Sequence, residues 1–284
     1  MLIRPYQLQE LEFAWCNRIY FRARTYRRKP IHALATLSAD ELSDALKPYN
    51  IELLELTATD IDIRALLSLT SFEATSTALS KTKGRISKWL SEHAAHTANR
   101  KHLAKGYFAV TTGQSTAAAV EQYLENQAEH HGYADRARPP VFVRSLTHPS
   151  ENARRLETDH AVTRLRYHLV FVVPYRRGVF HAESAADITA RWLELPEKFQ
   201  IDKVSFLPDH VHVAVTVHSR VAPADVACEL MNCSQDQMWE RHAHSVIRAG
   251  VDRLWRPSAY VGSFGDLSSN AISAYLQRWS ESPE

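Results

Sequence analysis

Alternation of apolar and polar residues recurs in two distant parts of the chain. The stretches NRIYFRA (17–23) and YHLVFVV (167–173) alternate like half-buried strands. Each is followed by a turn that contains Tyr-Arg-Arg, in TYRRKPI and PYRRGVF. The pattern therefore predicts the same strand and turn twice. The turn cations that it pairs are Arg27 and Arg28 with Arg176 and Arg177.

The next strand of each half also matches. Over this strand the two halves align at an offset of 150 residues (210 minus 60, and 212 minus 62). This alignment places Asp60 and Asp62 of the first half at the positions of His210 and His212 in the second. The two halves therefore carry different chemistry at equivalent places.

Two helical segments complete each half. The first carries Trp89 in one half and Trp239 in the other, again 150 residues apart (239 minus 89). The second begins with Ser and Thr residues, as helix N-caps do, in STAAAVEQYLENQ and SSNAISAYLQRW. It carries Tyr123 and Tyr275, each ten residues after a glycine (123 minus 113, and 275 minus 265).

These repeats predict two tandem α+β domains, forming α/β sandwiches, joined by a linker. We place the first domain at residues 1–133, the linker at 134–160 and the second domain at 161–284. The linker is rich in proline and charge, and its stretch PPVFVRSL is a candidate edge strand. Because two copies on one chain can pack like the subunits of a two-fold dimer, we expect a monomeric chain that acts as an intramolecular pseudo-dimer.

Composition constrains the class of protein. With 284 residues and a net charge of +2, the chain is long enough for two domains but too weakly charged to indicate a nucleic-acid partner by itself. Its three cysteines form no CxxC pair, which favours a reducing compartment. No apolar run approaches the length of about 20 residues that a membrane span needs, and no signal-peptide core is present at the start. We therefore expect a cytoplasmic protein without membrane contact.

His210 and His212 project from one face of their strand, while Val211 and Val213 project from the other. This spacing suits two ligands of one metal ion. Two polar residues that merely lie in a sheet give the same pattern, so the motif alone leaves both interpretations open.

A basic helix in the first half is a second candidate. Its cations fall largely along one side and are followed by Trp89, so they could bind phosphates while the ring stacks on a base. A solvated helix face explains the same charges equally well. The corresponding part of the second half reads LMNCSQDQ and has lost the positive charge. The cations are Lys81, Lys83, Arg85 and Lys88.

Tyr123 and Gln127 are four residues apart and so share one face of the last helix of the first half. Taken alone, this tyrosine would be assigned to packing. In company with the histidines it becomes a candidate phenolic nucleophile for metal-assisted phosphoryl transfer.

Together, YHLVFVVPYRRGVF, LPDHVHVAV, YVGSFG and YLENQ resemble the single-tyrosine HUH transposases of bacterial insertion sequences and their REP-associated relatives. HVH matches the His-hydrophobic-His element, and the resemblance covers nearly the whole chain, once per half. It implies two ferredoxin-like HUH domains with antiparallel sheets flanked by helices. It also implies a nucleoid-associated protein that acts on single-stranded or hairpin DNA. The DNA-binding residues that we expect include the turn cations Arg27, Arg28, Arg176 and Arg177.

The resemblance further implies that Mg²⁺ or Mn²⁺ is held by the histidine pair and by a glutamine one turn after the tyrosine. The tyrosine then attacks the scissile phosphate and leaves a 5′-phosphotyrosine link. The second half has Trp279 at the place of that glutamine, whereas the first half has the glutamine but no histidines. If the chain packs like a dimer of the family, one composite site forms. Its residues are His210, His212, Gln127 and Tyr123.

Alternatives remain open on the sequence alone. Tyr275 could serve the histidines of its own half in a cis site, and Asp60 with Asp62 could bind Mg²⁺ through their oxygens. The loss of the Pro-Asp turn and the presence of Arg64 favour a dead site there. The leading hypothesis is a transposase-like strand transferase. The competing hypothesis is a domesticated protein that binds hairpin or single-stranded DNA without cleaving it, and a general metal-dependent hydrolase ranks last.

Overall fold

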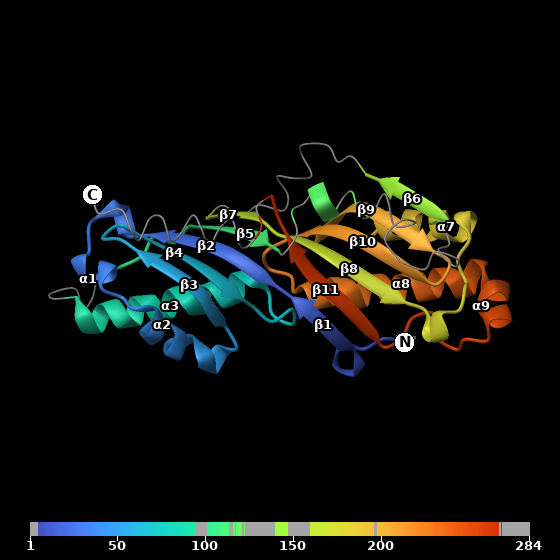
Figure 1. The fold of residues 1–284 in the computed structure, drawn as a ribbon, viewed down its shortest axis with the longest axis horizontal. Helices are drawn as coiled ribbons and strands as arrows, with labels where there is room; N and C mark the ends of the chain where they lie inside the picture. The colour runs from blue at the N-terminus through green and yellow to red at the C-terminus, as the bar shows by residue number, and fades with distance from the viewer. Residues whose placement is uncertain are drawn as a thin grey trace.

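The structure is a computed structural model that describes residues 5–94, 101–113, 116, 118–120, 122, 140–146, 160–195, 198–266 and 268. Two twisted sheets lie side by side along the long axis of the molecule, each flanked by helices (Figure 1). The prediction of an α+β fold with two repeated halves is confirmed. Within the described residues, no helix is long and apolar enough to cross a membrane.

Sheet A contains most of the second half, in the order β1-β11-β8-β10-β9-β6. Its strands are β1 (Glu12–Cys16), β11 (Ser258–Phe264), β8 (Arg166–Val172), β10 (His210–Val217), β9 (Phe199–Leu207) and β6 (Phe142–Ser145). Sheet B contains most of the first half, in the order β3-β4-β2-β5-β7. Its strands are β3 (Glu52–Ala58), β4 (Asp62–Ser68), β2 (Arg18–Arg24), β5 (Tyr107–Thr112) and β7 (Ala161–Arg164). Strand β6 lies in the predicted linker and pairs with the edge of β9, so the candidate edge strand is confirmed.

The two halves exchange their first strands. Strand β1 of the first half pairs parallel with β11, and β7 of the second half pairs parallel with β5. The remaining ladders within each sheet are antiparallel. Each sheet is therefore completed by a strand from the other half. The domain boundaries at residues 133 and 161 remain a prediction from the sequence repeats.

The segments that follow β5 and β11 cross where the sheets meet. Isolated bridges join Gly113 to Ser268 and Thr116 to Gly265. Hydroxyl groups bond reciprocally across this crossing, because Thr111 donates to the carbonyl of Phe264 and Ser263 donates to that of Thr112. A Cβ on Gly265 would come within 2.0 Å of the Thr111 carbonyl oxygen, so only glycine fits this approach.

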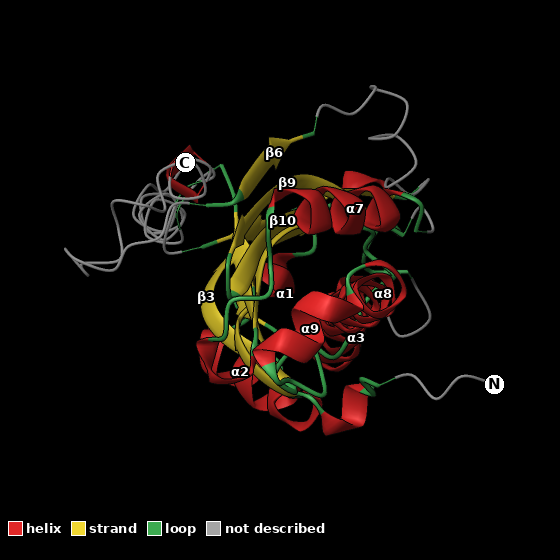
Figure 2. Ribbon diagram, turned by 90° about the vertical axis from the view of Figure 1, so that its right-hand side faces the viewer, coloured by secondary structure: helices red, strands yellow, loops and turns green. Residues whose placement is uncertain are grey.

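The long helices cover one side of both sheets (Figure 2). Apolar side chains on that side of sheet A, such as Val211, Val213 and Val215, are fully buried in the core. A capping box on Ser38 and Glu41 fixes the start of α2. The helices are α1 (His32–Ala35), α2 (Ala39–Leu46), α3 (Thr75–His93), α7 (Ala182–Leu193), α8 (Pro223–Arg241) and α9 (Ala243–Ala249), with 3-10 turns η1 (Leu8–Glu10), η2 (Tyr26–Arg28), η3 (Lys47–Tyr49) and η4 (Pro174–Arg176).

Strand pairing corrects the alignment of the two halves over the second matched strand. Asp62 pairs with Arg24 on β2, and His210 pairs with Val172 on β8, so Asp62 and His210 are equivalent at an offset of 148 (210 minus 62). Arg64 is then equivalent to His212. The predicted equivalence of Asp60 and Asp62 to the histidines was wrong by two residues. A shift of two keeps every side chain on the same face, so the apolar pattern alone does not detect it.

The helices obey the same corrected offset. Helices α3 and α8 begin at Thr75 and Pro223, which are 148 residues apart (223 minus 75). Reciprocal backbone hydrogen bonds just before and within these helices, from Ser76 to Ser219 and from Ala224 to Ser71, repeat that number. The predicted equivalence of Trp89 and Trp239 therefore fails as well.

Candidate functional site

The two histidines of β10 lie on the face of sheet A that points away from the helices. His210 and His212 are 3% and 4% exposed, and their ring centroids are 5.0 Å apart. The alternation of β10 brings this about, because its valines fill the core on the opposite face. The predicted shared orientation of the pair is present in the structure.

An acid and an arginine hold His210. Asp209 Oδ1 lies 2.6 Å from Nδ1 of His210, and Asp209 Oδ2 lies 2.8 Å from Nε of Arg176. Burial opposes the charge on this carboxyl, but the histidine and the arginine together lower the pKa of Asp209 below its usual value. Because a carboxylate only accepts hydrogen bonds, the contact places the proton on Nδ1 and leaves Nε2 as the ligating nitrogen of His210.

A third histidine, which the sequence interpretation missed, holds His212. His168 of β8 places Nε2 2.9 Å from Nδ1 of His212, and the two rings stack with centroids 5.1 Å apart. Burial lowers the pKa of His168 to about 4, so this ring is neutral near pH 7. When the shared proton lies on Nδ1 of His212, its Nε2 offers a lone pair in the same way as that of His210.

These side chains fit part of a divalent metal site. Two imidazoles with their Nδ1 atoms engaged are the usual presentation of histidine ligands. Among the residues that the structure describes, no group of three or more His, Cys, Asp and Glu side chains could hold a metal ion. The further ligand that the resemblance implies, Gln127, lies outside the described residues.

A segment of the first half lies on the histidine face. Val120 packs against Ala214 and Phe264. Ala214 comes two residues after His212 on β10 and so belongs to the same face. The helical residues 118–120 and 122 thus bring the start of the predicted tyrosine helix to the sheet of the other half. Tyr123 and Tyr275 themselves lie outside the described residues.

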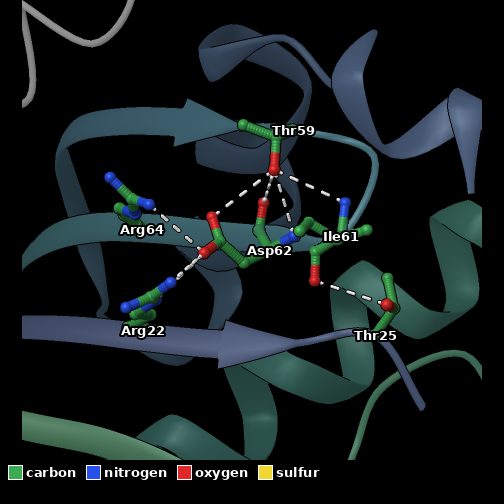
Figure 3. Close-up of polar contacts among 6 residues, drawn as sticks. All are labelled: Arg22, Thr25, Thr59, Ile61, Asp62 and Arg64. Atoms are coloured by element: carbon green, nitrogen blue, oxygen red, sulfur yellow. Dashed lines mark hydrogen bonds and ion pairs between the residues drawn. The ribbon is translucent and has the colours of Figure 1, made fainter. Parts of the chain in front are cut away.

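The equivalent face of sheet B holds an ion cluster in place of the histidines (Figure 3). Asp62 accepts hydrogen bonds from Nε of Arg22 at 3.0 Å and from Nη2 of Arg64 at 3.3 Å, and it also pairs with Nη2 of Arg22. Both Asp62 and Arg64 are buried, at 3% and 7% exposure. We call Arg22, Asp62 and Arg64 the arginine cluster.

Asp60 does not join this cluster. It lies in the turn before β4 and contacts Nδ1 of His32 at 2.7 Å on the surface. The proposal of an Asp60–Asp62 pair of oxygen ligands therefore lacks the required geometry. Asp62 is neutralised by guanidinium groups, and Arg64 occupies the place of His212.

The cations of the basic helix α3 contact other parts of the protein. Lys83 donates to the carbonyls of Ala104, Lys105 and Gly106, and burial lowers its pKa. Lys81 pairs with Glu73, and Arg85 lies over the ring of Tyr49. Lys88 is well exposed, 3.9 Å from Glu92. Helix α3 covers the side of sheet B away from the arginine cluster (Figure 2).

Two of the four turn cations contact other parts of the protein. Arg176 supports Asp209, and Arg177 donates to the carbonyls of Ala249 and Gly250. Arg27 and Arg28 are exposed and both have positive φ, 55° and 54°. In the second half the same backbone conformation falls on Tyr175 and Arg176, which again gives an offset of 148 (175 minus 27).

Comparisons with known proteins agree with the duplication. A family model described as "Transposase IS200 like" matches the chain twice, over residues 20–127 and 161–278. Among solved structures, a protein of Deinococcus radiodurans provisionally described as a transposase is 22% identical, with a TM-score of 0.35. That match covers 44% of this chain and 95% of the other. A comparison with curated proteins found no match.

Proposed function

Because this chain belongs to the IS200-like transposase family, which it matches once in each half, we propose that it nicks and rejoins single-stranded DNA at one composite site. The metal ligands are His210 and His212 of the second half with Gln127 of the first. The nucleophile is Tyr123. The substrate that we propose is a single strand that folds into a hairpin.

One observation carries the composite arrangement. Val120 of the first half contacts Ala214 on the histidine face. In a helix, residues three and seven positions after Val120 share its face, and these positions are Tyr123 and Gln127. The helix that the sequence predicts over these positions would therefore turn the proposed nucleophile and third ligand toward β10.

In the proposed reaction, the phenolate oxygen of Tyr123 attacks the scissile phosphorus. A phosphorus–oxygen bond to Tyr123 forms as the bond to the 3′ oxygen breaks, and the departing oxygen takes up a proton to become a 3′-OH. Bound Mg²⁺ or Mn²⁺ would polarise the phosphate and stabilise the charge that develops on its oxygens. Asp209 and His168 keep the two imidazoles oriented for that ion.

The arginine cluster supports the proposal that the opposite site does not cleave DNA. Arg64 cannot ligate a cation, because its guanidinium has no acceptor and stays charged. Tyr275 would then be without a metal site in the first half. A cis site that joins Tyr275 to the histidines of its own half is the direct competitor of the composite arrangement.

The test uses the full chain with labelled single strands that contain hairpins from the DNA flanking its gene. With Mn²⁺ we expect a covalent protein–DNA adduct that survives denaturation, and we expect none from His212→Ala. The control is Asp60→Ala, which should form the adduct as the wild type does. Tight hairpin binding without any adduct from the wild type would instead support the non-cleaving DNA-binding protein.

A further inference from the structure

Sheet B has a pocket beside the arginine cluster that the proposed cleavage reaction does not use. Its volume is about 690 Å³. The residues that line it are Tyr20, Arg22, Arg24, Ala104, Gly106, Tyr107, Phe108, His160, Ala161 and Val162. It opens on the face of sheet B that is equivalent to the histidine face of sheet A, since Arg22 and Asp62 point to that side.

The charge of the pocket favours an anion. Two guanidinium groups line it, and the described lining residues include no carboxylate. Arg24 is exposed, and Arg22 is about a third exposed, at 32%. Asp62 contacts Arg22 through Nε and Nη2, which fixes the plane of the guanidinium and leaves Nη1 with donors for another partner. Such a fixed, planar donor suits a phosphate.

Aromatic rings lie next to these cations. Tyr20 and Phe108 stand on neighbouring strands with their centroids 6.1 Å apart, and Phe108 is 39% exposed. An exposed ring beside arginines is the combination with which proteins hold unpaired bases and their phosphates. A small inorganic anion would make no stacking contact with the ring.

The rest of the pocket wall is held in place by hydrogen bonds and a close backbone contact. Lys83 fixes the loop of residues 104–106 through three carbonyls. Gly106 approaches His160 so closely that a Cβ would come within 2.7 Å of its carbonyl oxygen. Tyr107 donates a backbone hydrogen bond to the same carbonyl. The two sides of the pocket therefore keep a fixed separation.

From this arrangement we infer that the pocket binds one unpaired nucleotide of a single DNA strand without any metal ion. Arg22 and Arg24 contact its phosphate, and its base stacks on Phe108. The first half thereby still binds the DNA strand at the position where it has lost the metal site. The inference relies on the proposed function only for the choice of DNA as the ligand.

The test measures binding of fluorescein-labelled octathymidylate by anisotropy in EDTA, so that no metal contributes. We expect Phe108→Leu to weaken binding about tenfold, through the loss of one stacked base. We expect Arg24→Gln to reduce the slope of log affinity against log salt by about 0.7, the share of one phosphate contact on a single strand. The charge-matched control is Arg248→Gln, on the exposed side of α9, which should keep the wild-type slope.

Wild-type binding by both Phe108→Leu and Arg24→Gln would overturn the inference, as would a wild type that does not bind in EDTA. Both substituted side chains are exposed, so the variants should fold. Thymidine monophosphate distinguishes the source of the nucleotide: full displacement of the oligonucleotide by equimolar monophosphate would contradict a strand site.

Failure of the cleavage proposal gives a different result. A wild type that binds octathymidylate through Arg24 and Phe108 but forms no adduct with Mn²⁺ supports this inference and removes the strand transferase. A wild type that forms the adduct while both pocket variants bind normally supports the strand transferase and contradicts this inference.

Discussion

The two sheets carry different side chains at equivalent positions of the faces that point away from the helices: histidines on sheet A and an ion cluster on sheet B. On sheet A, Asp209 orients the imidazole of His210 and His168 orients that of His212. On sheet B, Asp62 and Arg64 stand at those positions and Arg22 closes an ion cluster. One face presents two imidazoles held by neighbouring side chains, whereas the other face holds an ion cluster made of the protein's own side chains.

This difference explains how a duplicated chain can specialise without losing its fold. Burying an unpaired carboxylate costs several kcal/mol, and the guanidinium groups offset that cost in sheet B. The backbone around them is unchanged, because both faces are built on the same strand pairing at an offset of 148 residues. What changed between the halves is the charge that occupies the face.

The largest expected effect is on the histidine face. Replacing His212 or His210 with alanine should slow DNA cleavage at least about a thousand-fold, equal to about 4 kcal/mol of barrier, because the metal loses one of two imidazole ligands. Single-turnover cleavage with Mn²⁺ measures this, with Asp60→Ala as the unaffected control. Cleavage at near wild-type rates by either histidine variant would remove the histidine face from the mechanism.

The arginine cluster should affect stability instead. Asp62→Ala should lower the free energy of unfolding by about 3 kcal/mol, because it leaves the buried guanidinium of Arg64 without its carboxylate. Asp60→Ala removes only a surface contact with His32 and should cost less than about 1 kcal/mol. Urea denaturation of both variants compares them, and equal losses would contradict the corrected strand register.

A smaller effect is expected from the support of His210. Asp209→Asn keeps the shape of the side chain but loses the charge that holds the proton on Nδ1, so Mn²⁺ should bind about 10-fold to 100-fold more weakly. Asp252→Asn, at an exposed position, is the charge-matched control. Titration calorimetry with Mn²⁺ reads both, and an unchanged affinity in Asp209→Asn would rule out the orienting role.

The smallest effect is a gain. The triple variant Asp62→His, Arg64→His, Arg22→Val should give sheet B a second Mn²⁺ site, at least about tenfold weaker than the first. Ile61 stands where Asp209 supports His210, so the new site lacks that hydrogen bond. The pair Asp60→His, Asp62→His should create none. Metal binding by the latter pair alone would restore the offset of 150.

The sequence alone was enough for the repeat, the family, the shared face of His210 and His212 and the edge strand in the linker. Each of these depends on local order along the chain or on a period of two. The residue-by-residue equivalence of β4 and β10 does not follow from either. An alignment shifted by two residues leaves each side chain on the same face of its sheet, so the hydrogen bonds of β4 to β2 and of β10 to β8 decide between the offsets.

Contacts between distant segments were also beyond the sequence. The role of His168 depends on which residue of β10 it faces, and the exchange of β1 and β7 depends on how the halves pack. The stretch of α8 that has lost positive charge, residues 230–237, has a comparable explanation. Asn232 and Gln235 are buried and bond Tyr6, so their side chains anchor the N-terminal segment. The polar side chains of this part of α8 are therefore explained by packing.

The central claim is that the histidines of one half serve the tyrosine of the other. The direct measurement is covalent adduct formation between a cognate hairpin strand and the variants Tyr123→Phe and Tyr275→Phe, in Mn²⁺ and at equal concentration. The composite site predicts no adduct from Tyr123→Phe and a wild-type yield from Tyr275→Phe. An adduct that persists in Tyr123→Phe and disappears in Tyr275→Phe would establish the cis site and contradict this account.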